Sequence, residues 1–213
     1  VAAGQLSNAA LMLRYGVALR DNPNDGYVMT LVLGDEDPLH PIRRVLLEAY
    51  GLPGTNVSFV LRRGIFPEEL FTTLRIHYSS ASEIDKFRNA FHKRAISLKN
   101  ELAVCRTTLA SIENLLSKYE TSLEEDIEVL EGKKLEPNQE MATVLRISDK
   151  SILRSVSEEV QRHWIRYLIE GYDDTELTEE MEADMDREEP TVIPGGDVEE
   201  EAPVVEEETH DEL

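Results

Sequence analysis

One run of apolar residues constrains the fold of this chain more than any other feature. Its members recur at alternating intervals of four and three positions: Phe91, Ala95, Leu98, Leu102, Cys105, Leu109, Ile112, Leu116 and Tyr119. Residues with this spacing lie on one face of an α-helix. The pattern therefore predicts one long helix over residues 91–119, with an apolar seam that another helix must cover.

A second amphipathic helix is predicted from Asp149 to Gly171. Its apolar stripe consists of Ile152, Leu153, Val156, Val160, Ile165, Leu168 and Ile169. The heptad seam would also suit a two-chain coiled coil, but this second helix offers a partner within the same chain. We therefore expect an antiparallel helical bundle and a monomer, with Cys105 buried in the seam as a small hydrophobic residue.

Residues 1–80 combine shorter elements. A first helix is predicted over Leu6 to Tyr15, and the turn-forming residues 20–26 (RDNPNDG) follow it. The further elements expected before residue 80 are extended segments at 27–33 and 56–64 that pair, a helix at 41–51, and a helix with Pro67 in its first turn. The expected fold class is mainly α: an antiparallel helical bundle with a small α+β N-terminal portion.

Capping motifs set two of the predicted helix starts. Ser80-x-x-Glu83 has the spacing of a capping box near the start of the long helix, and Thr121-x-x-Glu124 has that spacing where the chain restarts after Tyr119. Three carboxylates lie in the stretch SLEED, residues 122–126. At a helix start they are expected to complement the helix dipole and not to form a catalytic site.

The charge of the chain is concentrated at its C-terminal end. The net charge is -21, from 43 Asp and Glu against 22 Lys and Arg, and residues 173–213 contain 19 of the acids but only one base, Arg187. A segment of this composition cannot bury enough apolar surface to offset its ordering entropy, so we expect a disordered acidic tail. The acidity argues against nucleic-acid binding, which requires clustered Lys and Arg.

The sequence offers little for catalysis or metal binding. The five histidines show no i, i+4 pairing, and they are His40, His77, His92, His163 and His210. Cys105 is the single cysteine, so we expect no disulfide, no zinc cluster and a reducing compartment. No apolar run approaches the roughly 18 residues of a membrane span, and no membrane association is expected. These residues by themselves indicate a binding or scaffold module.

Two stretches of the chain resemble one family. Residues 4–25, GQLSNAALMLRYGVALRDNPND, are similar to the end of the SET domain in protein-lysine methyltransferases of the Rubisco large-subunit type, where the pattern YGxxSNxxLLxxYGF…NPxD is usual. The matching positions are Ser7, Asn8, Leu11, Leu13, Tyr15, Gly16, Asn22, Pro23 and Asp25. Residues 98–130 and 142–156 resemble the helical substrate-binding domain that follows SET in that family, with its signatures Y.TTLEED..LL and R..EK.IL.

The resemblance implies that the first helix completes a SET domain whose upstream part carries most of the S-adenosylmethionine site. Ala3 occupies the position of the family's catalytic Tyr, so no catalytic residue is expected in this chain, and Val17 replaces a family aromatic residue. Tyr15 is the one residue carried over, as a contact of the cofactor pocket or the lysine channel. Its alternative role is to pack the first helix onto the rest of the chain.

Two functions remain open on this resemblance. In the first, the chain is the substrate-recognition lobe of a SET-type protein N-methyltransferase, which positions a lysine, or in some relatives a histidine, of a protein substrate. In the second, it is a catalytically inactive SET-derived scaffold for protein interaction. The expected domains are the end of SET at 1–26, the helical substrate-binding domain at 27–172 and the tail at 173–213.

The compartment also stays open. Members of the resembling family work in plastid, cytoplasm or nucleus, and one of these is expected. The terminal residues 210–213 read HDEL, which is the retrieval signal of the endoplasmic reticulum, so that compartment is an alternative.

Overall fold

The computed structural model describes residues 6–32, 37–53, 56–87, 91, 95–132, 134–171 and 191–194. The elements in chain order are α1 (Asn8–Tyr15), β1 (Tyr27–Val32), α2 (His40–Ala49), β2 (Asn56–Leu61), α3 (Glu68–Tyr78), α4 (Ala81–Phe87), α5 (Leu98–Ser117), α6 (Leu123–Gly132), α7 (Pro137–Gly171) and β3 (Thr191–Pro194). The expectation of a mainly α fold is confirmed. None of the described helices has the length and apolarity that crossing a membrane requires.

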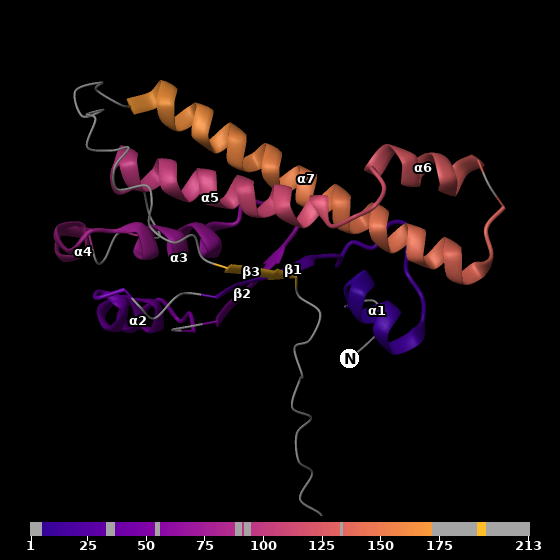
Figure 1. Cartoon of the computed structure of the whole chain (residues 1–213), viewed down its shortest axis with the longest axis horizontal. Helices are drawn as coiled ribbons and strands as arrows, with labels where there is room; N and C mark the ends of the chain where they lie inside the picture. Colours follow the sequence, from indigo (N-terminus) through magenta and orange to yellow (C-terminus); the bar gives the residue numbers. More distant parts are fainter. Residues whose placement is uncertain are drawn as a thin grey trace, which may run out of the picture.

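Helices α5 and α7 lie side by side along the length of the molecule (Figure 1). They run in opposite directions, because Glu101 near the start of α5 meets His163 late in α7, whereas Tyr119 just after α5 meets Asp149. The first half of α7 also packs against α6 and α1. The apolar face of α5 is thus covered within the chain, as the intramolecular alternative predicts.

The sheet contains three strands in the order β2-β1-β3. Strands β1 and β2 pair antiparallel, with Met29 opposite Phe59 and Leu31 opposite Val57. This pairing confirms the predicted extended segments, and alternate side chains of β2 enter the core. The third strand, β3, comes from the C-terminal tail, so the expectation of disorder is wrong for residues 191–194. The rest of the tail lies outside the described residues.

One hydrophobic core joins the sheet to the helices. Its largest fully buried side chains are Phe71, Phe91, Met29, Leu31, Leu47, Leu61, Leu70, Leu74, Ile76, Ile112, Leu115 and Ile152. Apart from Phe91, which lies between α4 and α5, they come from both strands of the β1–β2 pair and from helices α2, α3, α5 and α7. The sheet and the long helices therefore form a single packing unit.

The two long helices differ from their predicted extents. Helix α5 begins at Leu98 and not at residue 91, because the Ser97 side chain accepts a hydrogen bond from the Asn100 amide at 3.1 Å and ends the preceding segment. Helix α7 begins at Pro137, well before the predicted start at Asp149. Proline is tolerated in the first turn of a helix, where its missing N–H has no intrahelical partner.

Candidate functional site

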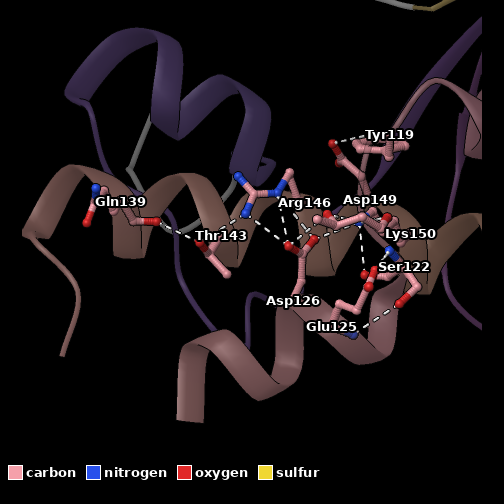
Figure 2. Close-up of polar contacts among 10 residues, drawn as sticks. Tyr119, Ser122, Glu125, Asp126, Gln139, Thr143, Arg146, Asp149 and Lys150 are labelled. Atoms are coloured by element: carbon pink, nitrogen blue, oxygen red, sulfur yellow. Dashed lines mark hydrogen bonds and ion pairs between the residues drawn. The ribbon is translucent and has the colours of Figure 1, made fainter. Parts of the chain in front are cut away.

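Four polar side chains in the first half of α7 connect it to three other parts of the chain. We call Arg146, Ser148, Asp149 and Lys150 the α7 junction. They contact α6, the segment after α5, and the turn that follows α1. Figure 2 shows Arg146 and Lys150 of α7 pointing toward Asp126 of α6, with Asp149 directed to Tyr119. The junction is where the two stretches that resemble the methyltransferase family meet.

Asp126 is the acidic centre of the α6 contact. Its carboxylate accepts hydrogen bonds from Lys150 Nζ at 2.7 Å and from Arg146 Nη2 at 2.9 Å. Both Asp126 and Lys150 are buried. Burial alone would raise the pKa of Asp126, but the hydrogen bonds from Arg146, Lys150 and Thr121 outweigh it and hold the pKa below its usual value. Asp126 is therefore ionised at neutral pH and fixes α6 to α7.

Asp149 has the opposite electrostatic environment. Its carboxylate accepts a hydrogen bond from the Tyr119 hydroxyl at 3.1 Å. Burial and the neighbouring Asp25 raise its pKa to about 6, although the Tyr119 hydrogen bond acts in the other direction. Burial and the Asp149 charge likewise raise the pKa of Tyr27 to about 12. This part of the junction disfavours negative charge.

Ser148 joins the junction to the segment that resembles the end of SET. Its hydroxyl donates a hydrogen bond to Asp25 Oδ2. The same oxygen accepts a hydrogen bond from the Asn8 side chain at 2.8 Å, and Asp25 Oδ1 accepts one from the Asn8 backbone N–H at 2.8 Å. The Asn8 side chain further bonds both backbone polar groups of Leu19, at 2.9 Å and 3.0 Å. These bonds hold the turn after α1 against α7.

The family-like residues around α1 thus have identifiable structural roles. Ser7 caps α1 by accepting a hydrogen bond from the Ala10 amide, and Gly16 ends it in the left-handed conformation, with a φ of 67°. Asn8 and Asp25 form the bonds to the following turn and to α7. The pattern SN…YG…NPxD therefore describes a cap, a helix end and a hydrogen-bonded turn.

The Asp126–Lys150 pair and the bonds of Asp25 position elements of the chain. The carboxylate of Asp126 and the ammonium of Lys150 are buried and bonded to one another. The Asp25 oxygens accept bonds from backbone and side-chain donors. A buried, fully engaged charge cannot readily exchange protons with a substrate, so the chemistry that suits this arrangement is orientation.

The prediction that the carboxylates of residues 122–126 complement the helix dipole was incomplete. Glu125 and Ser122 form a reciprocal capping box at 2.7 Å and 3.1 Å, so the box lies one residue after the predicted Thr121 and Glu124 pair. Asp126 does not serve mainly as a dipole partner, because it is the buried ion-pair partner of Lys150 and Arg146. The predicted Ser80–Glu83 box is present, but it caps the short helix α4 and not the long helix near whose start it was expected.

A second polar cluster lies between the other ends of α5 and α7. Glu101 is fully buried and receives two hydrogen bonds from Arg75, at 2.8 Å and 2.7 Å, and its Oε1 lies 2.6 Å from His163 Nε2. Burial alone would raise the pKa of Glu101, but hydrogen bonds from His163 and Arg75 lower it. Sequence spacing gave no sign of this cluster, because its members come from α3, α5 and α7.

The same region brings three metal-ligand types together, which the sequence did not predict. Glu101, Cys105 and His163 have donor atoms within 4.8 Å of one another. However, Arg75 already neutralises Glu101, and burial together with the Glu101 charge raises the pKa of Cys105 to about 12. A guanidinium beside the carboxylate and a protonated thiol disfavour a divalent cation, so this set does not fit a metal site. The predicted burial of Cys105 is confirmed.

The predicted cofactor contact Tyr15 lies on an open face. It ends α1 and is 57% exposed, next to Leu13 at 85%. Its alternative role, packing α1 onto the rest of this chain, is therefore wrong for the described residues, because Asn8 and Leu11, and not Tyr15, are the buried side chains of that helix. Ala3 lies outside the described residues.

Comparison with known families decides the relationship. The model of the family described as Rubisco LSMT substrate-binding matches residues 34–153, which is more than half of the chain. The chain belongs to this family. The α7 junction lies inside the matched range, as do Tyr119 and Asp126, which contact it.

Curated relatives of this Rubisco LSMT substrate-binding chain carry methyltransferase names. An Arabidopsis thaliana protein named [fructose-bisphosphate aldolase]-lysine N-methyltransferase, chloroplastic, is 25% identical over 71% of this chain and 33% of its own length. The human actin-histidine N-methyltransferase is 28% identical over 78% of this chain and 30% of its own length. The chain spans about a third of the length of the curated relatives it matches.

Solved structures with the same fold include two of LSMT. The SET domain of LSMT bound to methyllysine and AdoHcy aligns with a TM-score of 0.69 at 22% identity, over 80% of this chain and 41% of that one. Rubisco LSMT bound to AdoMet aligns with a TM-score of 0.67 at 22% identity, over 75% and 39% of the two chains. At this identity the likeness establishes the fold.

Proposed function

We propose that this chain is the substrate-recognition part of a SET-type protein N-methyltransferase that uses S-adenosylmethionine. Its target would be a lysine or a histidine of a protein, since relatives named for the two reactions are 25% and 28% identical to this chain. In this proposal α5, α6 and α7 form an antiparallel bundle that orients the protein substrate, and catalysis takes place in a part of the protein outside residues 1–213.

The single observation that carries this proposal is the α7 junction. Asp25 and Asn8, which resemble the end of a SET domain, are hydrogen-bonded to each other, and Asp25 is bonded to Ser148 within the family-matched segment. A catalytic domain that ends at α1 would thereby be held at a fixed orientation to the helical domain. Fixed orientation lowers the entropic part of the barrier for transfer to a bound protein.

The exposed side of α1 supports the domain division at residue 26. Apolar side chains on and after this helix are open to solvent: Leu13, Tyr15, Val17 and Leu19. Several exposed apolar residues close together in the sequence are a candidate for an interaction surface. We assign these residues to contact with the rest of a SET domain, with residues 1–26 as its end, 27–172 as the substrate-binding domain and 173–213 as the tail that supplies β3.

The residues described here do not by themselves fit S-adenosylmethionine. Tyr15 is 57% exposed and Leu13 is 85% exposed, so neither lies in an enclosed site. We propose Tyr15 as one wall of the cofactor or lysine site in a complete protein, and we derive no chemical step through the cofactor. Plastid, cytoplasm and nucleus remain the predicted compartments.

The test uses the complete reading frame that contains these residues, assayed for methyl transfer to protein in a lysate of its own organism. Asp25→Ala should lower kcat/KM for the protein substrate by about 10- to 100-fold, because it loosens the orientation of the two domains. The dissociation constant of S-adenosylmethionine should change much less. Arg162→Gln, which removes an exposed pair with Glu159, is the matched control and should leave both values unchanged.

The outcomes separate the two candidate functions. Equal losses of cofactor binding and protein methylation in Asp25→Ala would contradict the proposal that this chain orients the protein substrate and that the cofactor is bound elsewhere. An intact protein that binds a protein partner but transfers no methyl group to any substrate would favour the inactive scaffold. Circular dichroism melting of each variant shows whether a loss of activity reflects unfolding.

A further inference from the structure

The C-terminal tail contributes a strand to the sheet. Residues 191–194 form β3, which pairs antiparallel with β1 so that Val32 lies opposite Thr191 and Met29 opposite Pro194. Strand β3 lies beside β1 (Figure 1), and the strand order β2-β1-β3 places it at the edge of β1 opposite β2. Strand β1 is therefore central only because the tail supplies its second neighbour.

Strand β1 has a strong requirement for a partner at that edge. Its Met29 and Leu31 side chains are fully buried in the core. Without β3, its backbone N–H and C=O groups that face away from β2 would form an open edge on a hydrophobic strand. Such an edge readily adds another extended chain, because the main-chain hydrogen bonds are available to any sequence that adopts a strand.

The occupant that the structure places there is short and tethered. Strand β3 has four residues, and residues 172–190 separate it from the end of α7. A net contribution of about 0.5–1.5 kcal/mol for each hydrogen bond makes a strand of this length a weak ligand. Its retention is favoured by its covalent connection to the rest of the chain, because the pairing with β1 is then intramolecular.

The sequence around β3 distinguishes it from the rest of the tail. Residues 191–194 read TVIP and are uncharged, whereas Glu188 and Glu189 precede them and Asp197 follows. The β-branched residues favour an extended conformation. Pro194 then removes a donor at the end of the strand, which limits its length.

We propose that the outer edge of β1 is an exchangeable strand-binding site. The chain's own residues 191–194 occupy it, and an extended segment of a protein partner, rich in β-branched residues, takes their place when it binds. The tail thus regulates access to the edge by competition. This proposal is independent of methyl transfer, because it concerns binding at β1 alone.

The test uses the full chain, isotopically labelled for nuclear magnetic resonance, with Val192→Pro and Ile193→Pro together to release β3. The probe is a synthetic peptide of residues 188–197, EEPTVIPGGD. We expect saturable shifts in the amides of residues 27–32 of this variant. The unsubstituted chain should bind the peptide at least 10-fold more weakly, because its tethered strand competes.

Two peptide variants provide the control for strand geometry. Successive residues of a strand direct their N–H groups to opposite edges, so of Val192 and Ile193 only one N–H faces β1. Of peptides carrying Val192→Pro or Ile193→Pro, one should lose binding and the other should retain it. Equal behaviour of the two peptides, no binding to the released chain, or equal binding to released and unsubstituted chains would each overturn the proposal.

Discussion

At the scale of single residues, the α7 junction combines two carboxylates with opposite electrostatics. Asp126 is paired with Lys150 and Arg146, which stabilises its charge. Burial and the nearby Asp25 charge destabilise the ionised form of Asp149, whereas the hydrogen bond from the Tyr119 hydroxyl stabilises it. These two environments lead to separate predictions, one about a buried ion pair and one about pH.

Removing one partner of the buried pair should be more harmful than removing both. Asp126→Ala leaves the Lys150 ammonium, 3% exposed, without its carboxylate, and should lower the free energy of unfolding by about 3–5 kcal/mol. Adding Lys150→Met to Asp126→Ala should restore much of that loss, as measured by urea denaturation. Glu124→Gln, which breaks the exposed pair with Arg154, is the control and should leave the transition unmoved. Additive losses in the double variant would show that the pair is not coupled.

Asp149 should make stability decrease as the pH rises. Its pKa rises from 3.8 to about 6 on folding, so between these values the folded state binds the proton and the unfolded state does not. The corresponding stabilisation is complete below about pH 4 and is lost as the pH passes about 6, with an amplitude of about 1–3 kcal/mol. Urea denaturation of wild type and Asp149→Asn at both ends of this range measures it. The difference between the two proteins should change in favour of the variant as the pH rises, and a constant difference would contradict the assigned environment.

At the scale of elements, the α5–α7 contact holds the molecule together. The apolar period of α5 identified the correct face, but its members are not equally buried. Ile112 is 1% exposed, whereas Leu109 is only partly buried against the core. The neighbouring positions Val104 and Leu115 are buried although they lie outside the predicted seam.

This difference gives a ranked prediction for two seam residues. Ile112→Ala should lower the free energy of unfolding by about 2–5 kcal/mol, through lost transfer energy and a residual cavity. Leu109→Ala should cost roughly 1–2 kcal/mol, because part of its side chain already contacts water. Denaturation at several protein concentrations measures both. A midpoint that depends on concentration would indicate that a second chain covers the seam.

At the scale of the whole molecule, residues 1–213 should not bind S-adenosylmethionine with micromolar affinity. Tyr15 presents an open face, which can bury little of a small ligand, whereas binding sites for small molecules enclose most of the ligand surface. Isothermal calorimetry with the purified chain measures this, and a methyl-transfer assay with radiolabelled cofactor accompanies it. Tyr15→Ala is the matched variant and should give the same heats. Micromolar binding that Tyr15→Ala abolishes would place a complete site in this chain.

The sequence by itself determined what depends on local order along the chain. The helical content, the β1–β2 pairing, the Ser80 capping box and the end of α1 at Gly16 follow from periodicity, turn residues and caps that lie within a few positions of each other. The family-like motifs also located the residues that meet at the α7 junction, although not their contacts.

Only the tertiary structure decided which distant residues share an environment. Asp126 became a buried ion-pair partner, Glu101 met Arg75 and His163, and the tail supplied β3, because packing brought together positions that no local pattern links. The tertiary structure also decided that α7 starts at Pro137. The first half of this helix has a weak apolar period in the sequence, and contacts with α1 and α6 stabilise it. Burial removes water as the competing partner for charges and backbone groups, and it is fixed by the whole fold and not by neighbours in sequence.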